Sequence, residues 1–241
     1  VAIGYGALHG GFLAGHYGTN NIALGSNALY LNSAGSNNIA QGYRALTFNA
    51  TGNNNVAQGY RAINCNSGGN SNFAAGYKAI FNNKTGCNNF SQGYCSLYAN
   101  ICGCDNVAIG YQALASNTCG RNSIAIGYQA LYASTVSYGN VGLGCKSLCS
   151  TTTGAYNVGI GQLTLAFNTT GSTNTAIGPN ALQSNTFGCN NVAIGAATLI
   201  GNTTGSDNIA IGVEALKSNL TNQQNIAIGT STLRSSTANL N

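Results

Sequence analysis

The sequence predicts an all-β protein, a parallel β-solenoid of fourteen coils of about 17 residues. Three observations lead to this prediction. A short motif that ends in Gly recurs at a fixed interval, several positions of the repeat each hold one chemical kind of residue, and clusters of Asn, Thr and Gly separate the apolar stretches. Charged residues make up only 5% of the chain, so the ion pairs of an ordinary globular surface are largely missing.

The repeat is defined here by the Gly of its motif, which we number position 0. The first interval between these glycines is 21 residues and the next twelve are all 17. A helical hairpin does not fit into so short and Gly-rich a unit, whereas two short strands and two turns do. We therefore predict one repeat domain, 1–241, with an irregular insertion at 9–20 and regular repeats from about 21 to 241. The position 0 residues are Gly4, Gly25, Gly42, Gly59, Gly76, Gly93, Gly110, Gly127, Gly144, Gly161, Gly178, Gly195, Gly212 and Gly229.

Each part of the coil has its own signature. Apolar residues at −3 and −1 alternate with small ones at −2 and 0, which is the period of a strand. Position +4 is always Leu or Ile and predicts an apolar ladder inside the stack. Asn at −4 predicts a ladder of amides in which each side chain bonds to the next. The small residues at −2 and 0 are expected to leave room for a second surface to approach.

Position −1 breaks its own pattern, because it is Gln in three coils, at Gln41, Gln58 and Gln92. An amide in a dry core is costly without partners. Two interpretations stay open: a subunit interface with bridging water, or a Gln ladder inside a wide coil.

Several of these motifs resemble a known family. The stretches NNVAIG (190–195), DNIAIG (207–212), QNIAIG (224–229) and NTAIGPNAL (174–182) are similar to the head repeats of YadA-type trimeric autotransporter adhesins and to repeats in phage and viral fibre proteins. The resemblance implies a left-handed parallel β-roll, assembled as a homotrimer around an axis. The unit here is longer than the family's, which implies an enlarged turn, and the nine cysteines depart from a family that generally avoids them.

The cysteines are partly arranged in columns. Cys87 and Cys104 share a position in adjacent coils, as do Cys102 and Cys119, and stacked neighbours lie within reach of a disulfide. We predict both disulfides for an oxidising compartment; the alternative is free thiols that pack as small apolar groups. Five asparagines in sequons share position +7 and predict a glycosylated stripe on one turn; they are Asn49, Asn83, Asn168, Asn202 and Asn219.

Two further columns are candidate surface-binding groups. Position +1 holds Tyr in several coils, including Tyr43, Tyr60 and Tyr77, and position +2 holds Arg44, Arg61 and Lys78. A Tyr column binds sugars or packs between chains. The stacked cations form a basic stripe for acidic glycans or anionic surfaces, or they point into solvent.

No catalytic, cofactor or metal site is expected. His9 and His16 stand in the irregular segment without an acidic residue, and CGC at 102–104 lacks zinc-ligand spacing. The net charge of +5 is scattered along the chain, which argues against nucleic acid as a partner. No apolar stretch is long enough to predict insertion into a membrane.

The leading hypothesis is a non-enzymatic structural fibre or filament protein, extracellular or on a cell or virion surface, which partners with itself. Val1 begins within a motif and Asn241 ends within a coil, which predicts head-to-tail stacking or a piece of a longer fibre. The alternative is an adhesin head or viral fibre shaft that binds glycans or a host surface. Ice binding is a minor alternative, because its Thr column is interrupted at Gly68 and Cys102.

Overall fold

The computed structural model describes residues 1–10 and 18–234 and forms a β-solenoid of about 13 turns, close to the fourteen coils predicted. These residues contain strands, turns and bends but no helix. The chain divides into two compact units, Val1–Asn122 and Ser123–Asn241, each described by itself below. The central part of the irregular segment (11–17, with His16) and the last residues (235–241) lie outside the described residues, so the expectations placed there stay predictions.

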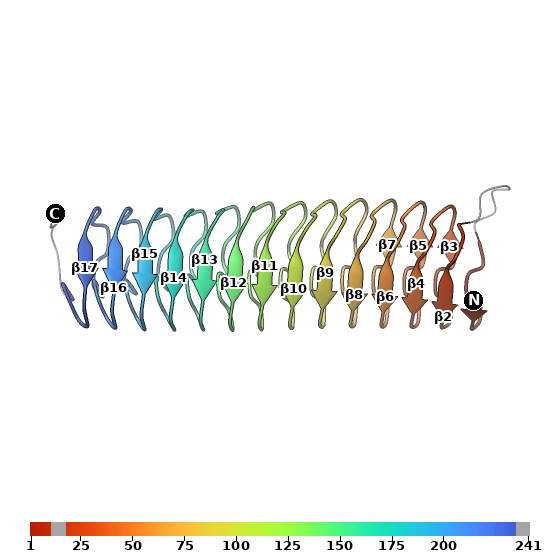
Figure 1. Cartoon of the computed structure of the whole chain (residues 1–241), viewed down its shortest axis with the longest axis horizontal. Coiled ribbons are helices and arrows are strands. Elements are labelled where there is room, and N and C mark those ends of the chain that lie inside the picture. The colour runs from red at the N-terminus through yellow and green to blue at the C-terminus, as the bar shows by residue number, and fades with distance from the viewer. Residues whose placement is uncertain (11–17, 235–241) are drawn as a thin grey trace. The chain divides into compact units, whose positions relative to one another are not determined.

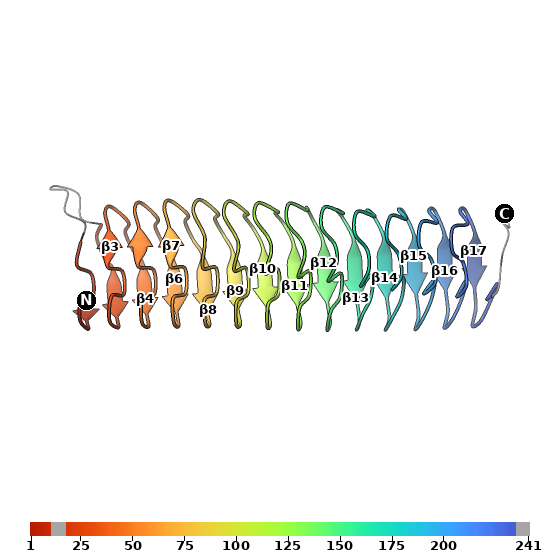
Figure 2. The same cartoon turned by 180° about the vertical axis from the view of Figure 1, so that it is seen from behind.

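In the first unit, each coil contributes one short strand to a parallel sheet (Figures 1 and 2). Partner residues are 17 apart from β2 onward, as in Ala40 with Ala57. Three coils add a strand to a second parallel sheet. The first sheet runs through β1 (Ala2–Ile3), β2 (Ile22–Leu24), β4 (Ile39–Gln41), β6 (Val56–Gln58), β8 (Phe73–Ala75), β9 (Phe90–Gln92) and β10 (Val107–Ile109), and the second through β3 (Leu31–Asn32), β5 (Phe48–Asn49) and β7 (Cys65–Asn66).

The second unit repeats this parallel stacking with one strand per coil, again at a step of 17 residues. Its strands are β11 (Ile124–Ile126), β12 (Val141–Leu143), β13 (Val158–Ile160), β14 (Thr175–Ile177), β15 (Val192–Ile194), β16 (Ile209–Ile211) and β17 (Ile226–Ile228).

The core of each coil is formed by positions −2, +3 and +4. Leu or Ile at +4 is fully buried from Leu29 to Leu216, as predicted, and small residues at −2 and +3 are buried with it; Ala57, Ala62 and Ile63 show this in one coil. The position −2 is therefore an inner one. Contrary to our expectation, its small residue does not open the outer surface to a second molecule. Because residues alternate along a strand, the large apolar residues at −3 and −1 point outward.

The Gly at position 0 ends each strand with a backbone that other residues rarely adopt. Its φ lies between 121° and 141° in every described coil. A Cβ built on Gly59 would lie 2.6 Å from the carbonyl oxygen of Gly76, one coil further. The invariance of this Gly therefore has two causes, the backbone angle and the close approach of the next coil.

Candidate functional site

The predicted amide ladder at −4 is present in both units. Asn38 donates its backbone N–H and its Nδ2 to Oδ1 of Asn21, at 2.9 and 3.2 Å. Asn55 repeats the same pair of bonds to Asn38, and Asn157 to Asn140 shows it in the second unit. The ladder thus bonds consecutive coils through side chains as well as through the sheet.

A second amide ladder runs along position +7, where we had predicted glycosylation. Nδ2 of Asn83 donates to Oδ1 of Asn66 at 2.8 Å and to the carbonyl oxygen of Gly86 at 2.9 Å. Nδ2 of Asn72, from the −4 ladder, donates to the same Gly86 carbonyl at 2.8 Å. Each such Gly at +10 therefore joins the two ladders inside the coil.

The prediction of a glycosylated stripe is wrong for the folded chain, because the amide nitrogen that would carry the glycan is buried and bonded. All five side chains are fully buried in the structure and lie in the inner ladder: Asn49, Asn83, Asn168, Asn202 and Asn219. The sequence contains a signal for this role, since Asn also occupies +7 in coils without a sequon, at Asn66 and Asn100.

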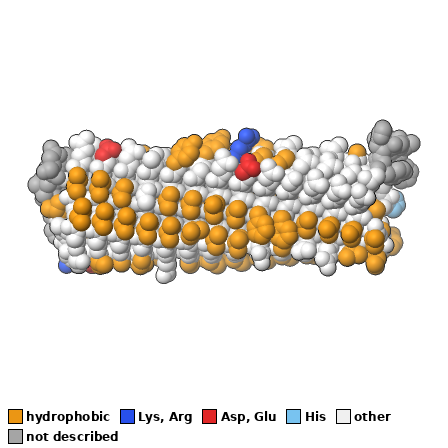
Figure 3. Space-filling model, in the orientation of Figure 1, with side chains coloured by type: hydrophobic (Ala, Val, Ile, Leu, Met, Phe, Trp, Pro, Cys, Tyr) orange, Lys and Arg blue, Asp and Glu red, His pale blue; other side chains and the backbone are white. Residues whose placement is uncertain are grey.

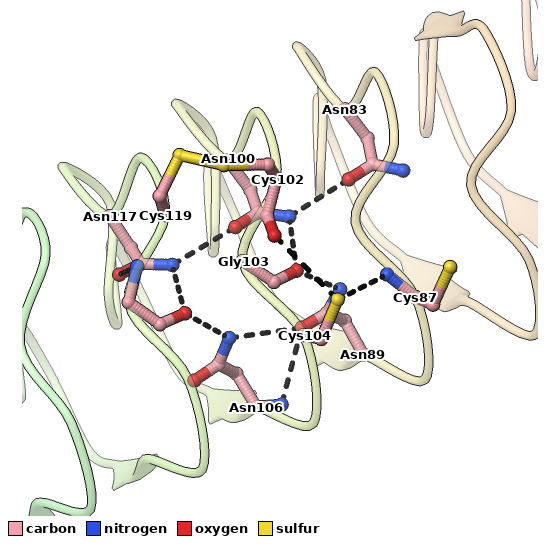
Figure 4. Close-up of a disulfide and its surroundings, with 11 residues drawn as sticks. Asn83, Cys87, Asn89, Asn100, Cys102, Gly103, Cys104, Asn106, Asn117 and Cys119 are labelled. Carbon is pink, nitrogen blue, oxygen red and sulfur yellow. Dashed lines mark hydrogen bonds between the residues drawn. A yellow bond between two sulfur atoms is a disulfide. The ribbon is translucent and has the colours of Figure 1, made fainter.

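Of the two predicted cysteine pairs, the structure joins Cys102 to Cys119 by a disulfide, with Cα atoms 4.7 Å apart (Figure 4). The other pair, Cys87 and Cys104, is not joined and corrects our expectation. Sγ of Cys104 accepts the backbone N–H of Cys87 at 3.2 Å, and Sγ of Cys87 accepts that of Asn70 at 3.3 Å. Each thiol at +11 therefore satisfies a backbone donor of the preceding coil, as the side-chain oxygen of Asn70 does for Asn53.

The tyrosines at +1 form a continuous stack of parallel rings on the first unit. Ring centroids are 5.4 Å apart from Tyr43 to Tyr60 and 5.0 Å from Tyr60 to Tyr77, and the stack continues through Tyr94 to Tyr111. Because neighbouring rings cover one another's faces, the stack exposes ring edges and hydroxyl groups. A sugar therefore cannot lie flat on this column between two stacked coils.

The cations at +2 lie against this stack and are not freely solvated. The guanidinium carbons of Arg44 and Arg61 are each 5.4 Å from the ring centroid of the tyrosine that precedes them. Nζ of Lys78 is 5.3 Å from Tyr77 and 5.5 Å from Phe81, so this ammonium lies between two rings. Columns +1, +2 and +5 are thus neighbours on one surface, a basic and aromatic strip.

The outward residues of the sheet make a second surface, which is apolar. Ile126 and Ile160 at −1 are 40% and 36% exposed, and Ile39 and Ile124 at −3 are similarly exposed. Hydrophobic side chains form rows across the coils on the face seen in Figure 3. The glutamines at −1 in β4, β6 and β9 also point outward, which excludes a Gln ladder inside a wide coil.

Four titratable groups among the described residues have pKa values shifted by their surroundings. Burial raises the pKa of the thiols of Cys65 and Cys95, and the neighbouring Cys95 raises the pKa of Tyr94. The hydrogen bond from Lys217, 2.6 Å away, lowers the pKa of the half-buried Glu214, and Arg234 adds to this. These are ordinary effects of burial and pairing on scattered groups.

Residues 1–10 and 18–234 hold no group of three or more His, Cys, Asp or Glu side chains placed to bind a metal ion. Within the same residues, no helix has the length and apolar character needed to cross a bilayer.

Comparison with known proteins adds no relative. No protein-family model, no curated protein and no solved structure matches the chain. The β-solenoid therefore rests on the structure itself.

Proposed function

We propose that this chain is a non-enzymatic structural fibre protein of a cell or virion surface that associates with copies of itself. The observation that carries the proposal is the outward apolar face of the main sheet. Soluble monomers rarely expose contiguous apolar patches of more than a few hundred Å². Here the same two outward columns recur coil after coil, with Ile124 and Ile126 as one example.

The apolar face favours side-by-side packing of identical chains. It is formed by columns that any copy of the chain also presents, and it carries no Lys, Arg, Asp or Glu in the described strands. A homotrimer is the assembly that the resemblance to YadA-type heads implies. Gln41 and Gln58 stand in the −1 column of this face, where bridging water would satisfy their amides in such an interface.

Head-to-tail stacking is the other form of self-association that the coil supports. Because consecutive coils repeat the same register, the strand edge of one coil is a template for another. An extracellular or virion setting is supported by the Cys102–Cys119 disulfide, since such bonds persist in oxidising compartments.

Light scattering on the purified chain tests self-association, and a pair of lysine variants tests the face. Ile160→Lys places a charge on the apolar face, and Gln162→Lys places the same charge two residues away at +1, where Gln162 is also exposed. We expect a mass near three times 24.4 kDa or a polymer for the wild type, a fall toward 24.4 kDa for Ile160→Lys, and no change for Gln162→Lys. A wild type that stays at 24.4 kDa at high concentration would refute self-association. Equal masses for the two variants would assign the interface to another surface.

An adhesive head that binds glycans is the second candidate, favoured by the basic and aromatic strip. The charges of Arg44, Arg61 and Lys78 face no acidic column, and the tyrosine stack beside them is exposed. Replacing Tyr60, Tyr77 and Arg61 is expected to abolish attachment to glycan-coated surfaces and to leave the fold intact. Attachment that persists would make these columns structural.

A further inference from the structure

The aromatic column at +5 of the first unit is interrupted over two coils. His9 and Tyr30 stack with ring centroids 5.0 Å apart, and Phe81 and Tyr98 stack at 5.2 Å. The two coils between these pairs carry Thr47 and Asn64, which are only 4% and 7% exposed. The outward ring is therefore missing at two consecutive levels.

Thr47 and Asn64 are held inward by a small polar cluster. Oγ1 of Thr47 donates to the carbonyl oxygen of Arg44 at 2.7 Å. Nδ2 of Asn64 donates to that same carbonyl and to Oγ1 of Thr47, both at 3.0 Å. In these same coils, β5 and β7 pair in the second sheet. The backbone therefore differs from that of most other coils at the levels where the outward ring is missing.

The missing rings leave a recess of about 310 Å³. One wall is the ring of Tyr30, whose other side is covered by His9, and Phe48 and Arg44 lie on its borders. Amide and hydroxyl groups complete the lining, which consists of Asn27, Tyr30, Arg44, Thr47, Phe48 and Asn64. An apolar ring face beside several polar groups is the usual composition of a small-ligand site.

The charge around this recess is unbalanced. Lys78 is flanked by rings on both sides, whereas Arg44 is flanked by a tyrosine on one side and by the recess on the other. Nε of Arg61, one coil further along the column, is buried and has no hydrogen-bond partner among the described residues. Asp105 is the only acidic residue in 1–122, and it accepts a hydrogen bond from Asn88. The described part of the first unit therefore supplies no acidic side chain as a counter-ion for these two guanidinium groups.

We propose that this recess binds one ring of an acidic glycan, carboxylated or sulfated, with the apolar face of the sugar on Tyr30 and its acid group on Arg44. Guanidinium groups bind such anions through paired, charge-assisted hydrogen bonds. Arg61 and Lys78 follow at successive coils, about 4.8 Å apart, a step comparable with one sugar unit of an extended polysaccharide. Consecutive acid groups of one glycan chain thus meet consecutive cations. This inference deepens the adhesive candidate function and rests on it.

Calorimetric titration with four probes tests the ligand class. They are an oligogalacturonate, a heparin-derived oligosaccharide, a neutral cello-oligosaccharide and a single-stranded oligodeoxynucleotide of matched charge. We expect one or both acidic glycans to bind, which also identifies the acid group as carboxylate or sulfate, and the neutral glycan to fail. Equal binding of the oligodeoxynucleotide would overturn the proposal in favour of a general polyanion surface.

Three variants test the site. Arg44→Gln removes the charge, and Thr47→Tyr restores the missing ring and fills the recess while all cations stay. Lys146→Gln is the matched control, because Lys146 also stands at +2 but follows Cys145 instead of a tyrosine. We expect both site variants to lower affinity about tenfold or more and the control to change it less than about twofold.

The outcomes separate the site from the function on which it rests. If the wild type binds neither acidic glycan, the adhesive candidate fails together with the site. If the wild type binds but Arg44→Gln and Thr47→Tyr bind as tightly as Lys146→Gln, only the site assignment is wrong. Thermal unfolding of each variant checks its fold, and Arg44→Gln tests the site even if Thr47→Tyr is destabilised, because it changes a side chain at the surface.

Discussion

Truncating one asparagine of the +7 ladder is expected to destabilise the first unit severely. In Asn83→Ala, three hydrogen bonds disappear: from Nδ2 to Asn66 and to Gly86, and from Nδ2 of Asn100 to Oδ1 of Asn83. A buried hydrogen bond contributes about 1 kcal/mol net. Oδ1 of Asn66 also loses its donor inside the coil, which costs about 1 kcal/mol or more. We therefore expect a loss of about 4 kcal/mol in the free energy of unfolding.

The matched control is Thr85→Ala, which destroys the same sequon without touching the ladder, because the side chain of Thr85 is exposed. Urea unfolding followed by circular dichroism compares the two variants with the wild type. We expect Asn83→Ala to unfold at a much lower urea concentration and Thr85→Ala to stay within about 0.5 kcal/mol of the wild type. Equal midpoints for the two variants, or a glycan on Asn83 of folded protein expressed in a secretory pathway, would refute the buried ladder.

Three further predictions concern the backbone, the thiols and the ion pairs around Glu214. Gly59→Ala is expected to cost about 2 to 3 kcal/mol or more in urea unfolding, since φ of 124° and the Gly76 carbonyl both oppose a Cβ; wild-type stability would contradict this. Iodoacetamide at neutral pH is expected to modify the exposed Cys145 well before Cys65, whose raised pKa and burial keep it a protected thiol; mass spectrometry of the peptides gives the order. Glu214 is expected to titrate below the ordinary range of Glu in an NMR experiment; because the folded pKa is lowered, its small contribution to stability is present above the unfolded pKa and is lost as pH falls through the folded value.

The sequence predicted the architecture well because the information lies in columns. A fixed interval of 17 residues, Leu or Ile at +4 and Asn at −4 each predicted a ladder, and Leu46 and Asn38 lie where expected. The direction of the strand side chains was not predicted. Large apolar residues at −3 and −1 were compatible with either face, and only the full burial of Ala57 together with Ile63 shows that the interior admits small residues at −2.

The candidate sites were harder to predict because one residue type serves different roles. An Asn that belongs to a sequon can also belong to a ladder. At Asn83, the hydrogen bond to Asn66 in the same column shows that the ladder role applies. Cys87 and Cys104 share a column, yet their thiols accept backbone N–H groups, a role that spacing alone does not reveal. The recess beside Arg44 follows from two side chains that turn inward, and a pattern of residue types does not specify that turn.

The division between inner and outer columns explains how such a uniform coil can still carry a specific site. Stability is concentrated at −4, −2, +3, +4, +7 and +10, where ladders and core leave few alternatives. Positions +1, +2 and +5 vary from coil to coil, so Thr47 and Asn64 can replace aromatic residues at +5 while Leu46 and Ile63 remain fully buried. A binding recess can therefore arise where two consecutive aromatic residues at +5 are replaced by small polar residues that turn inward, with the inner ladders unchanged.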